Sequence, residues 1–304
     1  MDRNQTTGHL CALVTILIWG TTFISTKVLL RDFAPVEILF TRFLVGYLAL
    51  LAVRPRRLRS GSARRELTFA AAGLCGVTLY FLLENIALTL TMASNVGVII
   101  SVAPIFTALL SHFFLENERL SARFFLGFAA AMGGIFLINW NGQALDLDPR
   151  GDLLALLAAA VWAVYSVLMR KIGGFGHDNI LCTRRVFAYG LLFMLPALAL
   201  MGFSPAPADL VRPENLLNLL YLGFGASALC FVTWNRAVGI LGAVKTSVYI
   251  YLVPLITVAF SAAILGEPVT GLELAGMALT LVGLALSEGR FPMRKGRVVS
   301  HERS

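Results

Sequence analysis

The chain has 304 residues, a formal net charge of +8, 58% hydrophobic residues and only 14% charged ones. A soluble domain carries about a quarter charged residues, so this composition argues against a soluble globule. The charges are clustered, and the apolar runs between them are roughly 20 residues long, enough for a helix to cross a bilayer core. The alternation with a period of two that is typical of membrane β-barrels is not seen. The sequence therefore predicts an all-α integral membrane protein.

The apolar runs predict about ten transmembrane helices. In chain order, the expected ranges are 9–30, 35–53, 67–90, 93–115, 121–139, 152–171, 179–202, 215–238, 243–265 and 271–288. Pro35, Pro149 and Pro213 stand just before expected helices, where a proline removes no helical hydrogen bond. The segment 202–214, which holds three prolines, is expected to be a non-helical loop.

The basic residues predict which side of the membrane each loop faces. The loop after the second expected helix carries six arginines between positions 54 and 65, and the tail 291–304 is also basic. Short loops rich in arginine and lysine stay on the cytoplasmic side. Both termini, this loop and the tail are therefore expected to be cytoplasmic, in a bacterial-type inner membrane.

The chain contains an internal duplication. The residue types at positions 79, 81, 85, 87, 93, 98, 100, 104, 107, 111 and 115 recur 150 positions later without a gap. Residues 1–140 and 150–290 are therefore predicted to be two copies of one five-helix unit. Because five is odd, the second copy must insert upside down. Inverted repeats of this kind are characteristic of transporters, whose substrate site lies near the midplane where the repeats meet.

Enzyme functions find little support in the sequence. It contains no HExxH motif and no phosphate-binding glycine loop, and its four cysteines lack metal-ligand spacing. No catalytic residue, metal or cofactor is therefore expected.

Ring-bearing and hydroxyl side chains near the expected midplane form the candidate binding site. Trp19 and Trp162 occupy matched positions within expected helices rather than at their ends, which favours aromatic walls of a cavity over a membrane-interface role. Tight core packing is the alternative for this pair. The predicted substrate-binding residues are Trp19, Tyr80, Glu84, Ser94, Ser101, Trp162, Tyr165, Trp234, Ser247 and Tyr251.

Glu84 is the one acidic residue clearly within the core of an expected helix. A carboxylate in hydrocarbon is costly and indicates a functional site. Three roles stay open: proton coupling, attraction of an amino group, and pairing with a buried base such as Arg236 or Lys245.

Other buried polar residues favour structural roles. The matched Asn85 and Asn235 are expected to bond across helices as a structural pair. Arg42 of the first copy recurs as Arg184 in the second. Both lie near the ends of expected helices, and their long side chains are expected to reach toward the membrane surface.

Two matched prolines, Pro104 and Pro254, lie within expected helices, where each removes one backbone hydrogen bond. Together with Gly97 they are candidates for hinges, and a static kink is the alternative.

The repeated motifs resemble a known family. The run Asn85-x-Ala87, Ala93-Ser94 and Pro104, with its second copy, is similar to the EamA-like branch of the drug/metabolite transporter superfamily. The resemblance covers about 280 residues and is greatest to the YddG-type exporters of aromatic amino acids. It implies ten helices in two inverted repeats, a central cavity and export of small metabolites or amino acids.

The resulting prediction is an inner-membrane exporter of amino acids, preferably aromatic or large apolar ones, that works by alternating access. The alternatives are a multidrug or organic-cation exporter and a non-transporting structural membrane protein. The expected partners are a small-molecule substrate and the lipid bilayer, without nucleic acid. The protein is expected to be a monomer or a weak homo-oligomer.

Overall fold

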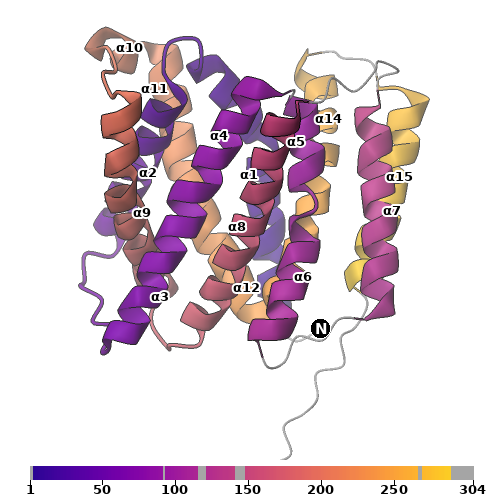
Figure 1. The fold of residues 1–304 in the computed structure, drawn as a ribbon, viewed down its shortest axis with the longest axis horizontal. Helices are drawn as coiled ribbons and strands as arrows, with labels where there is room; N and C mark the ends of the chain where they lie inside the picture. Colours follow the sequence, from indigo (N-terminus) through magenta and orange to yellow (C-terminus); the bar gives the residue numbers. More distant parts are fainter. Residues whose placement is uncertain (1–2, 92, 116–120, 141–147, 266–268, 289–304) are drawn as a thin grey trace, which may run out of the picture.

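A computed structural model shows the protein as a bundle of helices that stand side by side (Figure 1). The structure describes residues 3–91, 93–115, 121–140, 148–265 and 269–288. The basic tail expected at 291–304 lies outside these residues. Within the described ranges, the regular elements are all helical.

Five helical rods make up the described part of the first half. The first, second and fifth rods are continuous helices. The third rod is interrupted by a π-helical segment, and the fourth is broken near its middle. In chain order they are α1 (Arg3–Leu29), α2 (Pro35–Val53), α3 (Ala63–Gly73) with η1 (Leu74–Leu79) and α4 (Tyr80–Leu90), α5 (Ala93–Ile100) with α6 (Ala103–Phe114), and α7 (Ala122–Asn139).

The described part of the second half follows the same plan, with one short helix added. In chain order its elements are α8 (Pro149–Gly173), α9 (Asn179–Met201), the short α10 (Pro207–Val211), α11 (Pro213–Leu220) with η2 (Tyr221–Leu229) and α12 (Cys230–Leu241), α13 (Ala243–Ser247) with η3 (Val248–Tyr251) and α14 (Leu252–Leu265), and α15 (Gly271–Glu288).

The all-α membrane fold expected from the sequence is confirmed. Eight of the described helical stretches are long and apolar enough to cross a membrane, and Gly271–Ser287 is a shorter apolar helix. The number of ten membrane spans stays a prediction. One expectation is wrong: the segment 202–214 is not a plain loop, because it contains α10 and the start of α11. Pro207 and Pro213 each stand in the first turn of their helix, where a missing backbone N–H costs nothing.

The two halves are repeats of opposite orientation. In Figure 1, α3 lies at the lower end of its rod and α4 at the upper end, whereas α11 lies at the upper end of the matching rod and α12 at the lower end. The irregular backbone recurs as well. The π-helical segment 74–79 has its counterpart in 221–229, about 150 residues later. The fourth rod is interrupted at Ser101–Val102 in the first repeat and at Val248–Tyr251 in the second.

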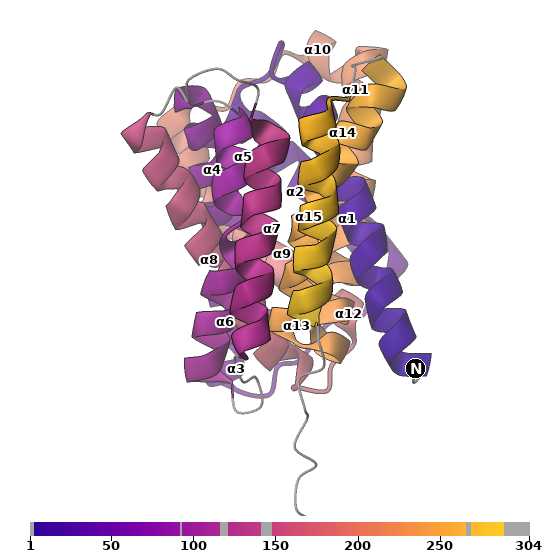
Figure 2. The same cartoon turned by 90° about the vertical axis from the view of Figure 1, so that its right-hand side faces the viewer.

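The last helices of the two repeats, α7 and α15, pack closely against each other (Figure 2). A Cβ atom at Gly134 would lie 2.5 Å from the backbone oxygen of Gly276, and a Cβ atom at Gly276 would lie 2.6 Å from that of Gly134. Only glycine permits this approach on both sides. Helices in lipid associate largely through such close packing, because apolar surface gains little by leaving lipid tails. The close approach of Gly134 and Gly276 therefore joins the two repeats.

Gly134→Ala is expected to destabilise the bundle by about 1–3 kcal/mol, because the added methyl group would overlap Thr280 and the backbone of α15. The neighbouring Gly133→Ala is the matched control. A Cβ atom there meets only Leu279 Cδ2, at 3.6 Å, and alanine favours the helix. Thermal unfolding of the two purified variants in detergent measures the difference. Equal melting temperatures would contradict the close crossing.

Single cysteines placed at Ser62 and Ser204, in a chain without its native cysteines, are expected to react from opposite sides of the membrane. Ser62 caps the lower end of α3, and Ser204 precedes α10 at the upper end of the bundle. The arginines around Ser62 predict that this residue faces the cytoplasm. A membrane-impermeant maleimide applied to intact cells should label only Ser204→Cys. Labelling of both positions from outside would refute the predicted orientation.

Candidate functional site

The rings expected to line the site form one cluster in the interior, centred on Trp162 of α8. The ring centroid of Trp162 lies 4.8 Å from that of Tyr80 and 5.4 Å from that of Trp19. Tyr165, one turn further along α8, lies 5.0 Å from Trp162. Trp234 of α12 contacts Trp19 at 5.2 Å and Trp162 at 6.1 Å. We call these five residues the aromatic cluster, and both repeats contribute to it.

Two members of the aromatic cluster carry buried polar atoms without a partner. The indole nitrogens of Trp162 and Trp234 find no hydrogen-bond acceptor among the described residues. Trp19 differs, since its indole N–H donates to the backbone oxygen of Ala226 at 3.1 Å. A buried donor left unpaired costs about 1–3 kcal/mol, so proteins rarely keep one without a reason. Both indole N–H groups are therefore free to donate to an acceptor on a bound molecule.

A hydrogen-bonded chain fixes one side of the aromatic cluster. The Tyr165 hydroxyl donates to Asn235 Oδ1 at 2.7 Å, and Asn235 Nδ2 donates to the hydroxyl of Thr183 at 3.1 Å. Asn235 thus bonds across helices as expected, but the expected pairing with Asn85 is wrong. The reason is geometric, because Asn235 lies against α8 and α9 and its amide is already occupied there.

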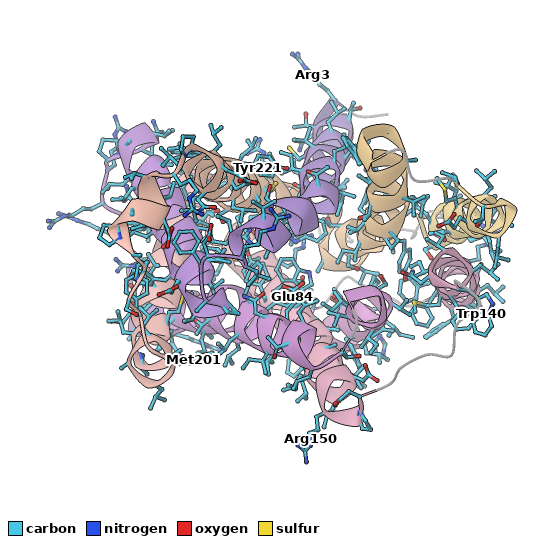
Figure 3. The ribbon with its side chains drawn as sticks, turned by 90° about the horizontal axis from the view of Figure 1, so that it is seen from above. Arg3, Glu84, Trp140, Arg150, Met201 and Tyr221 are labelled. Atoms are coloured by element: carbon cyan, nitrogen blue, oxygen red, sulfur yellow. The ribbon has the colours of Figure 1, made fainter. Side chains whose placement is uncertain are left out.

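Glu84 lies inside the bundle, away from the outward-pointing Arg150 and Met201, when the molecule is seen from above (Figure 3). The hydroxyl of Tyr80, one turn earlier on α4, donates to Glu84 Oε1 at 3.3 Å. This bond links the carboxylate to the aromatic cluster. The buried base that interacts electrostatically with Glu84 is Arg42, which corrects the expected pairing with Arg236 or Lys245.

The expectation that the Arg42 side chain reaches toward the membrane surface is wrong. The side chain is buried rather than extended to the membrane surface, and its Nε donates to Ser227 Oγ at 3.0 Å. The guanidinium carbon lies 5.0 Å from the ring centre of Phe81 and 5.4 Å from that of Phe43. Arg42 is the eighth residue of the 19-residue helix α2 and therefore lies nearer its middle than its end. This position was the one signal in the sequence that its side chain could be buried. The matched Arg184 is also buried, and donates to the backbone oxygens of Arg54 and Arg56.

Ser101, Ser247 and Tyr251 lie in the interior but have different surroundings. Ser101 donates to the Gly97 backbone oxygen at 2.8 Å, and Ser247 donates to that of Val244 at 2.7 Å, so both bond to their own helices. Tyr251 is fully buried, and its hydroxyl has no partner among the described residues. The side chain of Ser94 lies outside the described part of the chain. A binding role for these four residues stays a prediction.

The prolines expected to act as hinges mark junctions between helical segments. Pro104 stands in the first turn of α6, directly after the break at Ser101–Val102. Pro254 is the third residue of α14, after the 3₁₀ turn Val248–Tyr251. Pro104 therefore does not interrupt a continuous helix, as the sequence suggested, but begins a new segment. A Cβ atom at Gly97 would meet nothing within 4 Å, so close packing does not explain that glycine. The hinge role of all three residues stays a prediction.

Comparison with known proteins identifies the fold. The sequence model of the EamA-like transporter family matches the chain twice, over residues 6–140 and 149–288. The chain belongs to the EamA-like transporter family. A solved crystal structure with 21% sequence identity superposes with a TM-score of 0.76 and covers 93% of this chain and 96% of its own. That likeness concerns the fold alone.

Relatives of this EamA-like transporter align over nearly their whole length. An uncharacterized transporter of Archaeoglobus fulgidus is 32% identical over 93% of this chain and 97% of its own. A "Probable amino-acid metabolite efflux pump" of Salmonella typhimurium is 27% identical, over 95% and 97% of the two chains. A "Probable terminal-alkyne amino-acid exporter" of Streptantibioticus cattleyicolor is 28% identical, over 91% and 92%. The protein is thus a multi-pass membrane transporter of a small molecule.

Tyr165→Phe is expected to destabilise the transporter by about 1–3 kcal/mol, because it leaves the buried Asn235 oxygen without its donor. Tyr47→Phe is the matched control, since the Tyr47 hydroxyl makes no hydrogen bond to a described residue and the same atom is removed. Urea unfolding of both variants, followed by tryptophan fluorescence, provides the measurement. If both variants lost the same free energy of unfolding, the Tyr165–Asn235 hydrogen bond would contribute nothing to stability.

Proposed function

We propose that this EamA-like transporter exports amino acids with aromatic or large apolar side chains by alternating access across a bacterial-type inner membrane. The observation that carries the proposal is the aromatic cluster, with two indole N–H groups that have no acceptor among the described residues and a carboxylate hydrogen-bonded to Tyr80. These groups supply both an apolar wall and polar contacts, which an amino acid needs together.

The chemistry of the aromatic cluster suits such a substrate. Offset or edge-to-face contacts between rings contribute about 0.5–1.5 kcal/mol beyond burial, so an aromatic side chain binds better than a small polar one. The indole N–H groups of Trp162 and Trp234 can each donate a hydrogen bond to an acceptor atom of the substrate without carrying a fixed charge. Binding of this kind is weak enough to allow release, which an exporter requires.

Alternating access requires the aromatic cluster to open. Trp162 is 4% exposed and Trp234 is fully buried, so a substrate reaches them only when helices separate. We assign this movement to the junctions before Pro104 and Pro254, where the regular α-helix of the fourth rods is interrupted. The π-helical segments η1 and η2 lie in the neighbouring rods, and such segments are frequent at functional sites.

Two of the relatives support amino acids as the substrate class, because their names describe an amino-acid metabolite efflux pump and an amino-acid exporter. The alternative, an organic-cation exporter, needs a site dominated by negative charge. In this structure the buried Glu84 has a buried arginine, Arg42, as its electrostatic neighbour. The amino-acid proposal is therefore the better match.

Trp162→Ala is expected to lower counterflow of phenylalanine at least about tenfold more than counterflow of threonine, because the threonine side chain gains nothing from ring contacts. The measurement uses the purified protein in proteoliposomes, with an organic cation as a third substrate.

Trp140→Ala is the matched control for this experiment. Trp140 is 45% exposed, and its ring contact among the described residues is with Phe136, which is not a member of the aromatic cluster. It should leave all substrates unaffected. An equal loss for phenylalanine and threonine in Trp162→Ala would make Trp162 a packing residue, and counterflow of the cation alone would overturn the proposed substrate class.

A further inference from the structure

Two opposite charges lie buried in the interior without a direct ion pair. Arg42 of α2 is 7% exposed, and Glu84 of α4 is 9% exposed. They interact electrostatically, but none of the ion pairs between described residues joins Arg42 to Glu84. Taking a charge out of water costs several kcal/mol unless close partners replace the water. Two buried charges without a direct ion pair are therefore expensive, and their presence in the interior requires an explanation.

Arg42 has unused hydrogen-bonding capacity. A guanidinium has five N–H donors, and the one hydrogen bond of this side chain to a described residue runs from Nε to Ser227. The rings of Phe43 and Phe81 contact the guanidinium group but offer it no hydrogen-bond acceptor. The two Nη atoms form a planar fork that matches a carboxylate, which binds such a fork through two parallel bonds.

Glu84 has unused capacity as well. A carboxylate accepts about four hydrogen bonds, and Glu84 accepts one from a described residue, the Tyr80 hydroxyl. A primary ammonium group carries three donors and a positive charge, so it complements the remaining lone pairs. Tyr80 also contacts Trp162, with ring centroids 4.8 Å apart. The carboxylate is therefore placed beside the aromatic cluster.

We propose that Arg42 and Glu84 together recognise the zwitterionic head of an amino acid. Arg42 binds the α-carboxylate through its Nη atoms, and Glu84 binds the α-ammonium group. The side chain of the substrate then extends along Tyr80 toward Trp162. This inference rests on the proposed function and names the residues that select its substrate class.

The arrangement explains selectivity by charge. An organic cation satisfies Glu84 but meets the like charge of Arg42, and an organic anion satisfies Arg42 but meets the like charge of Glu84. A zwitterion satisfies both and adds no net charge to the site. Empty or loaded, the pair stays neutral, so neither state places an unbalanced charge in a low-dielectric interior.

Three ligands that share one ring separate these contributions. L-phenylalanine carries both charged groups, phenethylamine lacks the carboxylate, and 3-phenylpropanoate lacks the ammonium group. Calorimetric titration of the purified full-length protein in detergent gives a dissociation constant for each. The wild type is expected to bind L-phenylalanine at least about tenfold more tightly than either analogue, because hydrogen bonds to charged groups are the stronger kind.

The variants shift these preferences in opposite ways. Arg42→Gln is expected to remove the preference for L-phenylalanine over phenethylamine. Glu84→Gln is expected to remove the preference for L-phenylalanine over 3-phenylpropanoate. Arg42→Lys keeps the charge but loses the fork, so it should reduce the first preference without removing it. Ratios of dissociation constants do not depend on the fraction of folded protein. If Arg42→Gln does not fold, Arg42→Lys alone tests the contribution of the guanidinium fork.

Arg184→Gln is the matched control, because Arg184 is the duplicated counterpart of Arg42, is also buried, and bonds to backbone oxygens outside the site. It should keep both preferences. Equal weakening of all three ligands by Arg42→Gln, or the same shift in Arg184→Gln, would overturn the proposal. A wild type that binds phenylalanine no better than its analogues would overturn it while leaving amino-acid export in place. A wild type that binds no phenylalanine would overturn the proposed function as well.

Discussion

Contacts between the two repeats hold this bundle together. The indole rings of Trp19 and Trp162 meet edge to face with centroids 5.4 Å apart, and the duplicated Phe81 and Phe231 lie 6.4 Å apart. At the side of the bundle, Gly134 and Gly276 approach through their backbones. Lipid tails are as apolar as leucine, so burial alone does not drive these helices together. Close packing along the line where the repeats meet supplies the attraction instead.

The candidate site lies where equivalent positions of the two repeats carry different residues. Glu84 and Trp234 stand at equivalent positions, as do Tyr80 and Cys230, so one repeat contributes a carboxylate and a phenol where the other contributes an indole and a thiol. The same is true of the duplicated arginines, which have different partners. A symmetric scaffold thus carries an asymmetric interior, and an amino acid, which has unlike ends, requires an asymmetric site.

The irregular backbone lies close to this interior. Membrane helices keep their hydrogen bonds within the segment because lipid offers no substitute for water. Departures from regular helix are therefore tolerated only inside the protein. The π-helical segments η1 and η2 and the junctions before Pro104 and Pro254 occur in the third and fourth rods of both repeats. The duplication has preserved these irregular segments together with the helices.

Much of this protein could be predicted from its sequence, because hydropathy, the 150-residue duplication and the mid-helix tryptophans are properties of single helices or of their order. The membrane fold, the inverted repeats and the expectation that Trp19 and Trp162 form walls of one interior follow from these. The partners of buried polar groups do not. Arg42 meets Ser227 and Asn235 meets Tyr165 across 185 and 70 residues. Which face of one helix lies against which face of another depends on the packing of all of them, so only the tertiary structure decided that Arg42 and Glu84 share one interior.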